Sequence, residues 1–340
     1  MNKFLPLLLI SFCWSCTESS EVEKYQDERD NIVNIKDKIK EIVIDDILID
    51  SRAELYTMGD YLLIQDIESY DKLIHLFDKK TFKYRASTAN KGPGPREIAI
   101  LGSLGIDEVR NKFYFSDHGK LNILTFDLDS VLVDPFYEPH VKMKIKPRQF
   151  PSEYIYVNDT LCISRIITPI GNNDFKTSVG KWNMSTGEIE LMKNDHPEIK
   201  KKRINFIASI EHNIYVECYS NHDLMTICSL DGNLKHNIYG PRWGNETKGI
   251  RDYITPIICR DKIIVSYSGK VNFEKDANGK LKYNYPSTIL VFDLNGNYIK
   301  TLETAYEINS FCYDKDNHRL ILNLNEEMQF AYLDLNGLVD

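Results

Sequence analysis

The sequence lacks the short motifs by which many enzymes and cofactor sites are recognised. It has no GxSxG, HExxH or HxH motif, and no CxxC after residue 16, so neither a nucleophile elbow nor a zinc site is indicated. The glycine-rich stretch Asn90–Glu97 contains Pro93 and Pro95, which lack the backbone N–H donors that a phosphate-binding loop needs. We therefore predict no cofactor and no local catalytic motif.

The chain also lacks a basic excess and a cysteine framework. The net charge is −8, which argues against nucleic acid as a partner. The one basic cluster, at residues 200–203, is expected to lie in a solvated loop. Five cysteines remain after Cys16, an odd number in strand-like apolar runs, so we predict buried thiols rather than disulfide bonds.

The N-terminus has too short an apolar run to span a bilayer. Lys3 precedes the apolar run from Leu5 to Phe12, whereas a transmembrane helix takes about 20 apolar residues. A charge, a short apolar run and small residues are typical of an export signal, here residues 1–16. Ser15 directly before Cys16 resembles a bacterial lipobox, in which the cysteine is lipidated; cleavage without a lipid is the alternative.

Residues 17–38 contain many acidic and few apolar side chains. We predict that they form a flexible, solvated linker between the anchor and the folded part. The folded part is then expected at residues 39–340.

A pattern of about fifty residues repeats six times along that part. Apolar residues lead to an aspartate or a similar polar residue and then to a turn, most clearly in Leu290–Gly296. Asp-Gly and Asn-Gly supply the positive φ angles of tight hairpin turns. The equivalent polar residues stand at positions 78, 127, 183, 229, 293 and 334.

This period indicates an all-β fold, a six-bladed β-propeller of four-stranded antiparallel blades. No helical periodicity is visible after residue 40, and the second unit is expected to start its fourth strand near Val131. The last unit ends too soon after Asn336 for a fourth strand. We predict that residues 39–50 supply the missing strand beside Phe330 and Tyr332 and so close the ring.

The loop Asn90–Glu97 also carries a family resemblance. With the strand that ends at Ile106-Asp107, the lipobox and the six units, it resembles the six-bladed propeller lipoproteins of Bacteroides-like bacteria, described as TolB-like or NHL-like. The loop departs from the usual form at Pro95 and Arg96. The resemblance implies a fold and an outer-membrane location facing the periplasm or the surface; it implies no particular activity.

Three hypotheses for function follow. The first is a lipid-anchored binding or scaffold protein of the cell envelope, with an envelope protein or a glycan as partner and contact with the membrane only through its anchor. The second is a hydrolase or lactonase-like enzyme with a metal ion in the central channel. The third, by analogy of fold, is a periplasmic partner of a transport or sensor system.

Loop positions suggest where a binding surface would lie. In a propeller, the loops from strand four to the next strand one share a face with the loops between strands two and three. Two long loops of the second kind are expected, at residues 168–177 and 269–286. Aromatic and arginine side chains are frequent at binding hot spots. The residues predicted to form a binding face are Arg96, Arg242, Trp243, Tyr283 and Tyr285.

Overall fold

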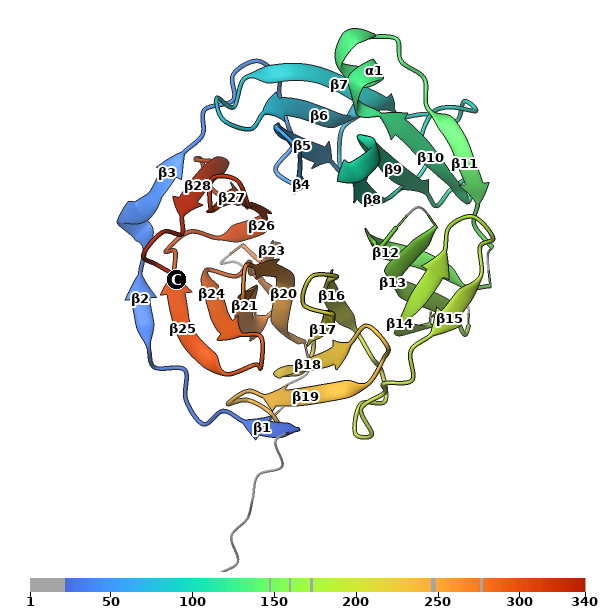
Figure 1. Cartoon of the computed structure of the whole chain (residues 1–340). Helices are drawn as coiled ribbons and strands as arrows, with labels where there is room; N and C mark the ends of the chain where they lie inside the picture. The colour runs from blue at the N-terminus through green and yellow to red at the C-terminus, as the bar shows by residue number, and fades with distance from the viewer. Residues whose placement is uncertain are drawn as a thin grey trace, which may run out of the picture.

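Six sheets are arranged in a ring in the computed structural model (Figure 1). The structure describes residues 22–146, 148–158, 160–171, 174–245, 249–275 and 278–339. The predicted all-β, six-bladed propeller is confirmed, because each of the six sheets contains four antiparallel strands. The strands follow chain order from the centre outward, except that the outermost strand of the last sheet comes from the N-terminal part of the chain.

The first three blades are continuous in sequence. Blade 1 contains β4 (Ala53–Met58), β5 (Tyr61–Asp66), β6 (Lys72–Asp78) and β7 (Tyr84–Asn90). Blade 2 contains β8 (Leu101–Asp107), β9 (Lys112–Asp117), β10 (Asn122–Asp127) and β11 (His140–Lys144). Blade 3 contains β12 (Phe150–Tyr156), β13 (Leu161–Pro169), β14 (Phe175–Asn183) and β15 (Ile189–Leu191).

Among the last three blades, blade 6 takes one of its four strands from the N-terminal part of the chain. Blade 4 contains β16 (Ile204–Ser209), β17 (Ile214–Tyr219), β18 (Leu224–Ser229) and β19 (Leu234–Tyr239). Blade 5 contains β20 (Ile250–Cys259), β21 (Lys262–Val271), β24 (Thr288–Asp293) and β25 (Tyr298–Glu303). Blade 6 contains β26 (Ile308–Asp314), β27 (Arg319–Leu324), β28 (Phe330–Asp334) and β3 (Ile39–Glu41).

The six equivalent positions of the repeat all fall at the same place in the blades. Each is the last residue of the third strand, at 78, 127, 183, 229, 293 and 334. Its side chain accepts hydrogen bonds from the turn that follows; Asp78 Oδ1, for example, accepts from the backbone N–H of Thr81 at 2.8 Å, and Asp293 Oδ1 from that of Asn295 at 2.9 Å. The repeat is therefore a turn signal as well as a strand signal.

Each junction between neighbouring blades has its own apolar core. Six clusters of buried side chains occur, and each draws its members from two adjacent blades. The cluster between blades 1 and 2, for instance, packs Leu63 and Leu76 against Phe113 and Phe126. Because a blade is buried on both faces, its strands are apolar at nearly every position, as in the fully buried β18.

The N-terminal part of the chain closes the ring, as predicted. β3 pairs antiparallel with β28, and Lys40 lies opposite Tyr332. The strand is shorter than residues 39–50, but the pairing continues through Ile42, whose N–H donates to the carbonyl of Phe330 at 2.8 Å. Ile42 and Ile49 are buried between blades 6 and 1.

The prediction of a flexible linker is wrong for the described residues 22–38. β1 (Glu23–Tyr25) pairs parallel with β19, and β2 (Ile32–Asn34) pairs parallel with β25. These strands follow the outer rim of blades 4 and 5 (Figure 1). The outermost strand of a blade has unpaired N–H and C=O groups, which favour pairing with a further strand. The acidic composition of residues 22–38 gives no indication of this pairing.

Two local expectations are also corrected. Residues Leu128–Val133 form a short helix, α1, in place of a strand starting near Val131, because Asp127 Oδ1 accepts from the N–H of Ser130 at 3.0 Å and caps the helix. The basic cluster is not wholly solvated, because the Lys202 side chain is 6% exposed and its Nζ lies 2.7 Å from Glu217.

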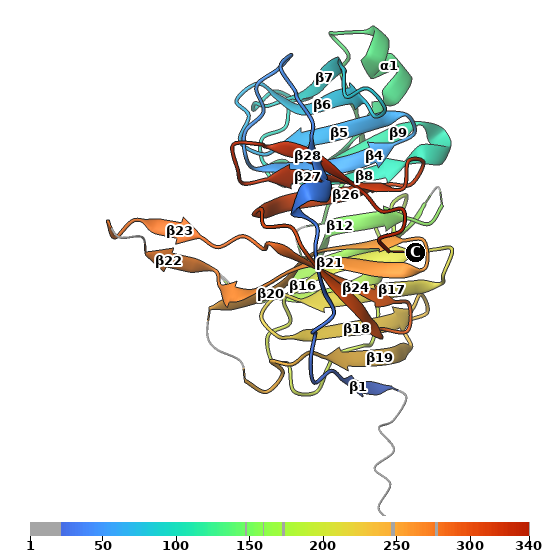
Figure 2. The ribbon, with the colours of Figure 1, turned by 90° about the vertical axis from the view of Figure 1, so that its left-hand side faces the viewer.

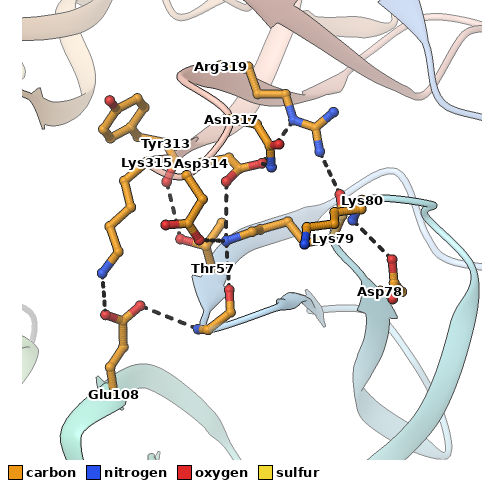
Figure 3. Close-up of polar contacts among 12 residues, drawn as sticks. Thr57, Asp78, Lys79, Lys80, Glu108, Tyr313, Asp314, Lys315, Asn317 and Arg319 are labelled. Carbon is orange, nitrogen blue, oxygen red and sulfur yellow. Dashed lines mark hydrogen bonds and ion pairs between the residues drawn. The ribbon is translucent and has the colours of Figure 1, made fainter.

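A polar network joins the first and last blades (Figure 3). It lies on the face opposite the loops that lead from a fourth strand to the next first strand, because Lys79 follows the third strand β6 and Asp314 ends the first strand β26. Lys79 of blade 1 is 2% exposed and its Nζ lies 3.2 Å from Asp314 Oδ1 of blade 6. Arg319 binds the same carboxylate at 2.9 Å and also donates to the carbonyl of Lys79. Lys315 extends the network to Glu108 of blade 2 at 2.5 Å. This network fixes the junction where the ring closes.

In the part of the chain that the structure describes, no helix has the length and apolar character needed to cross a membrane.

Candidate functional site

The six first strands surround a central channel with a cavity volume of about 800 Å³. They are β4, β8, β12, β16, β20 and β26. Every first strand begins at the face where the loop from the fourth strand of the preceding blade lies, and it runs toward the opposite face. The starts of these strands therefore form one mouth of the channel and their ends form the other.

The channel changes character along its axis. Most polar lining residues stand near the starts of the first strands, and most lining residues nearer their ends are apolar; Leu101 at the start of β8 and Thr57 near the end of β4 are exceptions. The polar lining residues near the mouth include Arg52, Glu54, Glu153, Asn205, Arg251 and Asn309. The lining residues toward the opposite end include Ile106, Ile207, Ile257 and Tyr313. A concave surface with a few convergent polar groups above an apolar wall is the usual form of a small-molecule site.

Arg165 and Glu153 form one charged pair of the mouth. Their closest atoms, Nη1 and Oε2, are 3.4 Å apart. Arg165 also donates to the carbonyl of Ile204 at 3.0 Å and so connects blades 3 and 4. Burial raises the pKa of Glu153, and the guanidinium of Arg165 opposes that rise.

Blade 1 contributes a second set of polar groups. The hydroxyl of Tyr56 donates to Glu54 Oε2 at 2.8 Å, and Arg52 pairs with Glu68 at 2.8 Å. Glu54 and Glu153 are close enough for the charge of Glu54 to raise the pKa of Glu153 further. The mouth thus holds two carboxylates from different blades.

A hairpin of blade 5 overhangs the mouth. β22 (Phe273–Lys275) and β23 (Leu281–Tyr283) pair with each other and project from one face of the ring (Figure 2). Tyr283 and Tyr285 line the channel, and their ring centroids are 6.4 Å apart. Tyr283 also contacts Phe273, with centroids 4.3 Å apart. Three aromatic rings therefore lead from the exposed hairpin to the channel.

The structure places the five predicted binding-face residues in three different surroundings. Only Tyr283 and Tyr285 line the channel. Arg96 lies on the exposed loop between β7 and β8 and pairs with Glu138. That loop is braced from within, because Glu97 accepts from the N–H of Gly94 at 2.7 Å and Lys120 donates to the carbonyl of Glu97 at 2.6 Å.

Arg242 braces the junction of blades 4 and 5, and Trp243 braces the junction of blades 3 and 4. Arg242 Nη2 lies 2.9 Å from Asp252 Oδ1, whose side chain is fully buried. Trp243 packs on the rings of Tyr239 and His196, with centroid distances of 4.8 and 5.3 Å. Both side chains are engaged within the fold.

The polar residues of the first strands were not predicted as site residues from the sequence, and neither were Gln65 and His118 beside them. A sequence feature that could have identified these channel residues is a polar residue near the start of an otherwise apolar first strand, as at Glu54 and Asn205. Among the residues that the structure describes, no group of three or more His, Cys, Asp or Glu side chains could hold a metal ion.

Cys16 and the export signal lie outside the described residues. The five cysteines of the described part are all free and buried, as predicted. Burial raises the pKa of Cys162 and Cys228 to about 12.

These features define a six-bladed β-propeller with an open, polar channel mouth. The family model DUF5128, described as 6-bladed beta-propeller, matches residues 43–230, and the chain belongs to this family. A search of curated proteins gives no match.

Solved structures show the same fold at low identity. A member of the DUF4221 family from Bacteroides vulgatus is 11% identical, with a TM-score of 0.58 over 88% of this chain and 98% of that chain. A Bacteroides fragilis protein inferred to be exported is 12% identical, with a TM-score of 0.52 over 92% and 97%. A calcium-binding protein, regucalcin, from Agrobacterium tumefaciens is 11% identical, with a TM-score of 0.53 over 89% and 95%.

Proposed function

We propose that this protein is an exported, lipid-anchored binding protein of the cell envelope, and that it takes its ligand at the mouth of the central channel. The main observation in support of this proposal is the central channel. Its volume of about 800 Å³ falls in the range of small-molecule sites, and its mouth combines paired charges, amides and tyrosines. A rigid ring of blades holds these groups in place, while the β22–β23 hairpin adds an exposed aromatic element.

The proposal of export and anchoring depends on the sequence of residues 1–16. Lipidation of Cys16 would tether the propeller to the outer membrane through its N-terminus. The Cys16→Ala variant should then no longer incorporate labelled fatty acid and should leave the membrane fraction. Unchanged labelling and fractionation in that variant would rule out lipidation at Cys16.

The binding site is tested by comparing variants of the predicted residues that line the channel with a variant of a predicted residue that lies outside it. Tyr283→Ala and Tyr285→Ala should weaken capture of an envelope component while leaving the melting temperature unchanged, because Tyr283 is half exposed and Tyr285 is only partly buried. Arg96→Ala, which removes an exposed pair outside the channel, is the matched control and should retain capture. Loss of capture in Arg96→Ala with full capture in the tyrosine variants would place the site elsewhere.

The hypothesis of a hydrolase with a channel metal has two observations in its favour. Glu54 and Glu153 bring two carboxylates of different blades to the same mouth, and the regucalcin relative is described as calcium-binding. Two carboxylates with channel amides such as Asn205 supply the oxygen ligands that calcium prefers. Calorimetry with Ca²⁺ should then show binding that Glu54→Gln and Glu153→Gln each abolish. Binding unaffected by both variants would place any calcium outside the channel.

A further inference from the structure

The first strand of blade 2, which forms part of the channel wall, has an irregular backbone. In the pairing of β8 with β9, Leu101 lies opposite Asp117 and Leu104 opposite Phe115, so Gly102 and Ser103 share one partner position. Such bulges concentrate next to functional sites, because they redirect the backbone and side chains toward a ligand. Gly102 and Ser103 both line the channel.

Gly102 allows two polar side chains to approach the bare backbone. A Cβ atom at this position would lie 2.8 Å from His118 Nε2 and 2.6 Å from the carbonyl oxygen of Ser116. Gln65 approaches the same residue, and its Nε2 donates to the carbonyl of Gly102 at 3.1 Å. Gln65, Gly102 and His118 therefore form one small polar wall, contributed by blades 1 and 2.

Two polar atoms of this wall lack a protein partner. Within the described ranges, neither Gln65 Oε1 nor His118 Nε2 has a hydrogen-bond partner, although both atoms are buried. The Gln65 residue is 3% exposed and nevertheless lines the channel. Leaving a buried polar atom unsatisfied costs about 1–3 kcal/mol, and native proteins seldom do so without a reason.

The chemistry of the two atoms selects the ligand. Gln65 Oε1 is an acceptor, while the ring nitrogen of His118 donates or accepts according to its tautomer. Burial lowers the pKa of His118, so its ring is neutral at neutral pH. A hydroxyl group both donates and accepts, so adjacent hydroxyls on one ligand satisfy both atoms. The wall itself offers a ligand no charge, because Gln65, Gly102 and the neutral ring of His118 carry none.

The aromatic rings at the mouth also suit a ligand that carries several hydroxyl groups. Tyr285, Tyr283 and Phe273 form a contiguous series, with centroid distances of 6.4 and 4.3 Å. Tyrosine presents an apolar face and a polar tip, which suits a ring with apolar C–H faces and a hydroxylated edge.

From this juxtaposition we infer that Gln65, Gly102 and His118 form a subsite for a neutral, polyhydroxylated ligand, a mono- or oligosaccharide, which stacks on Tyr285 and Tyr283 as it enters the channel. This inference rests on the proposed function, because it names the ligand class of the same channel mouth.

The test is calorimetric titration of the mature protein with a panel of neutral sugars: glucose, galactose, mannose, N-acetylglucosamine, maltose and cellobiose. At least one should bind with a dissociation constant of millimolar or tighter. Gln65→Leu and His118→Phe should each weaken that binding at least tenfold. Gln329→Leu is the matched control, because Gln329 also donates to a backbone carbonyl, that of Asp50 at 2.8 Å, but does not line the channel.

The melting temperature of each variant separates lost binding from lost folding. If Gln65→Leu melts early, His118→Gln serves instead, since it removes the ring and keeps a polar end. The inference is overturned if no sugar in the panel binds, or if sugars bind equally to the wall variants. A second panel of glucuronate, amino acids and short peptides then shows which proposal has failed.

If a compound of the second panel binds and Tyr285→Ala weakens that binding, the channel is a binding site for another ligand class and only the sugar inference is wrong. If no compound of either panel binds in the channel, the sugar inference and the proposed function are both wrong.

Discussion

Arg29 and Asp223 form a buried ion pair across 194 residues of sequence. The two side chains are 8% and 0% exposed, and Arg29 Nη2 lies 2.9 Å from Asp223 Oδ1. Arg29 also donates to the hydroxyl of Tyr253 at 2.7 Å and lies over the ring of Tyr267. The residues before β3 therefore insert a cation between blades 4 and 5, where a free linker was expected.

Removing that cation should destabilise the fold strongly. Arg29→Met leaves Asp223 buried without its main counter-charge, so we expect the free energy of unfolding to fall by about 3–5 kcal/mol. Arg52→Met is the matched control, because its pair with Glu68 is 57% and 44% exposed and should contribute at most about 1 kcal/mol. Urea unfolding of the two variants measures both values. Equal, small losses would show that Arg29 does not anchor the segment.

Gly240 should prove indispensable because of the same pair. A Cβ atom there would lie 2.1 Å from Asp223 Oδ1 and 2.3 Å from Arg29 Nη2. Gly240→Ala should therefore destabilise the protein, by about 1–3 kcal/mol for overpacking, and the loss should shrink in the Arg29→Met background. Gly171→Ala is the control and should melt like the wild type, because none of the described residues places an atom within 4 Å of a Cβ at that position. Additive losses in the double variant would contradict the steric explanation.

Truncation separates the two roles of the N-terminal segment. Starting the chain at residue 39 removes β1, β2 and Arg29, and we expect a folded protein with a clearly lower melting temperature. Starting it at residue 51 also removes β3 and Ile42, so the ring cannot close and cooperative unfolding should be lost. A control that starts at residue 22 should melt like the mature protein. If the chain from residue 51 melts like the one from residue 22, closure by β3 is wrong.

The buried carboxyl of Asp252 should make stability depend on pH. Burial raises its pKa from 3.8 to about 6, the charge of Asp223 adds to the rise, and Arg242 opposes it. Between about pH 4 and 6 the folded protein therefore binds more protons than the unfolded chain, and this group's contribution to the free energy of unfolding falls as the pH rises.

The Asp252→Asn variant isolates that contribution. Relative to the wild type, its free energy of unfolding should rise by about 1–3 kcal/mol between pH 4 and 7, as Asp252 in the wild type ionises. Carboxyls whose pKa values are lowered, such as Asp66 and Asp314, act in the opposite direction but are present in both proteins and cancel. Urea unfolding at several pH values measures the difference, and a constant difference would contradict the raised pKa.

Features with local causes could be predicted from the sequence. Asp293 and Asp334 mark the ends of third strands because they cap the turn directly after them. The closing strand could be predicted by counting, since the last unit ends at Asn336 without a fourth strand.

Features that depend on distant partners could not be predicted. Arg29 stands in an acidic, polar segment that resembles a solvated linker, and nothing near it in sequence indicates Asp223. Gln65 and His118 meet only because adjacent blades bring β5 and the end of β9 to the same glycine. Arg242 and Trp243 do stand in the predicted loop, but their orientation follows from Asp252 and Tyr239, which composition does not reveal.

The most direct test of the channel as the binding site is the alkylation rate of a cysteine placed in its wall. In the mature protein, Ser103→Cys puts a thiol on the channel, whereas the native cysteines of the described part are buried. Ser185→Cys, in an exposed turn after the third strand of blade 3, is the control on the opposite face. We expect the small-molecule fraction of the bacterial envelope to slow alkylation of Ser103→Cys several-fold and to leave the rate for Ser185→Cys unchanged. The protection of Ser103→Cys should be lost when Tyr285→Ala is added. Equal alkylation rates of Ser103→Cys with and without that fraction would contradict binding in the channel.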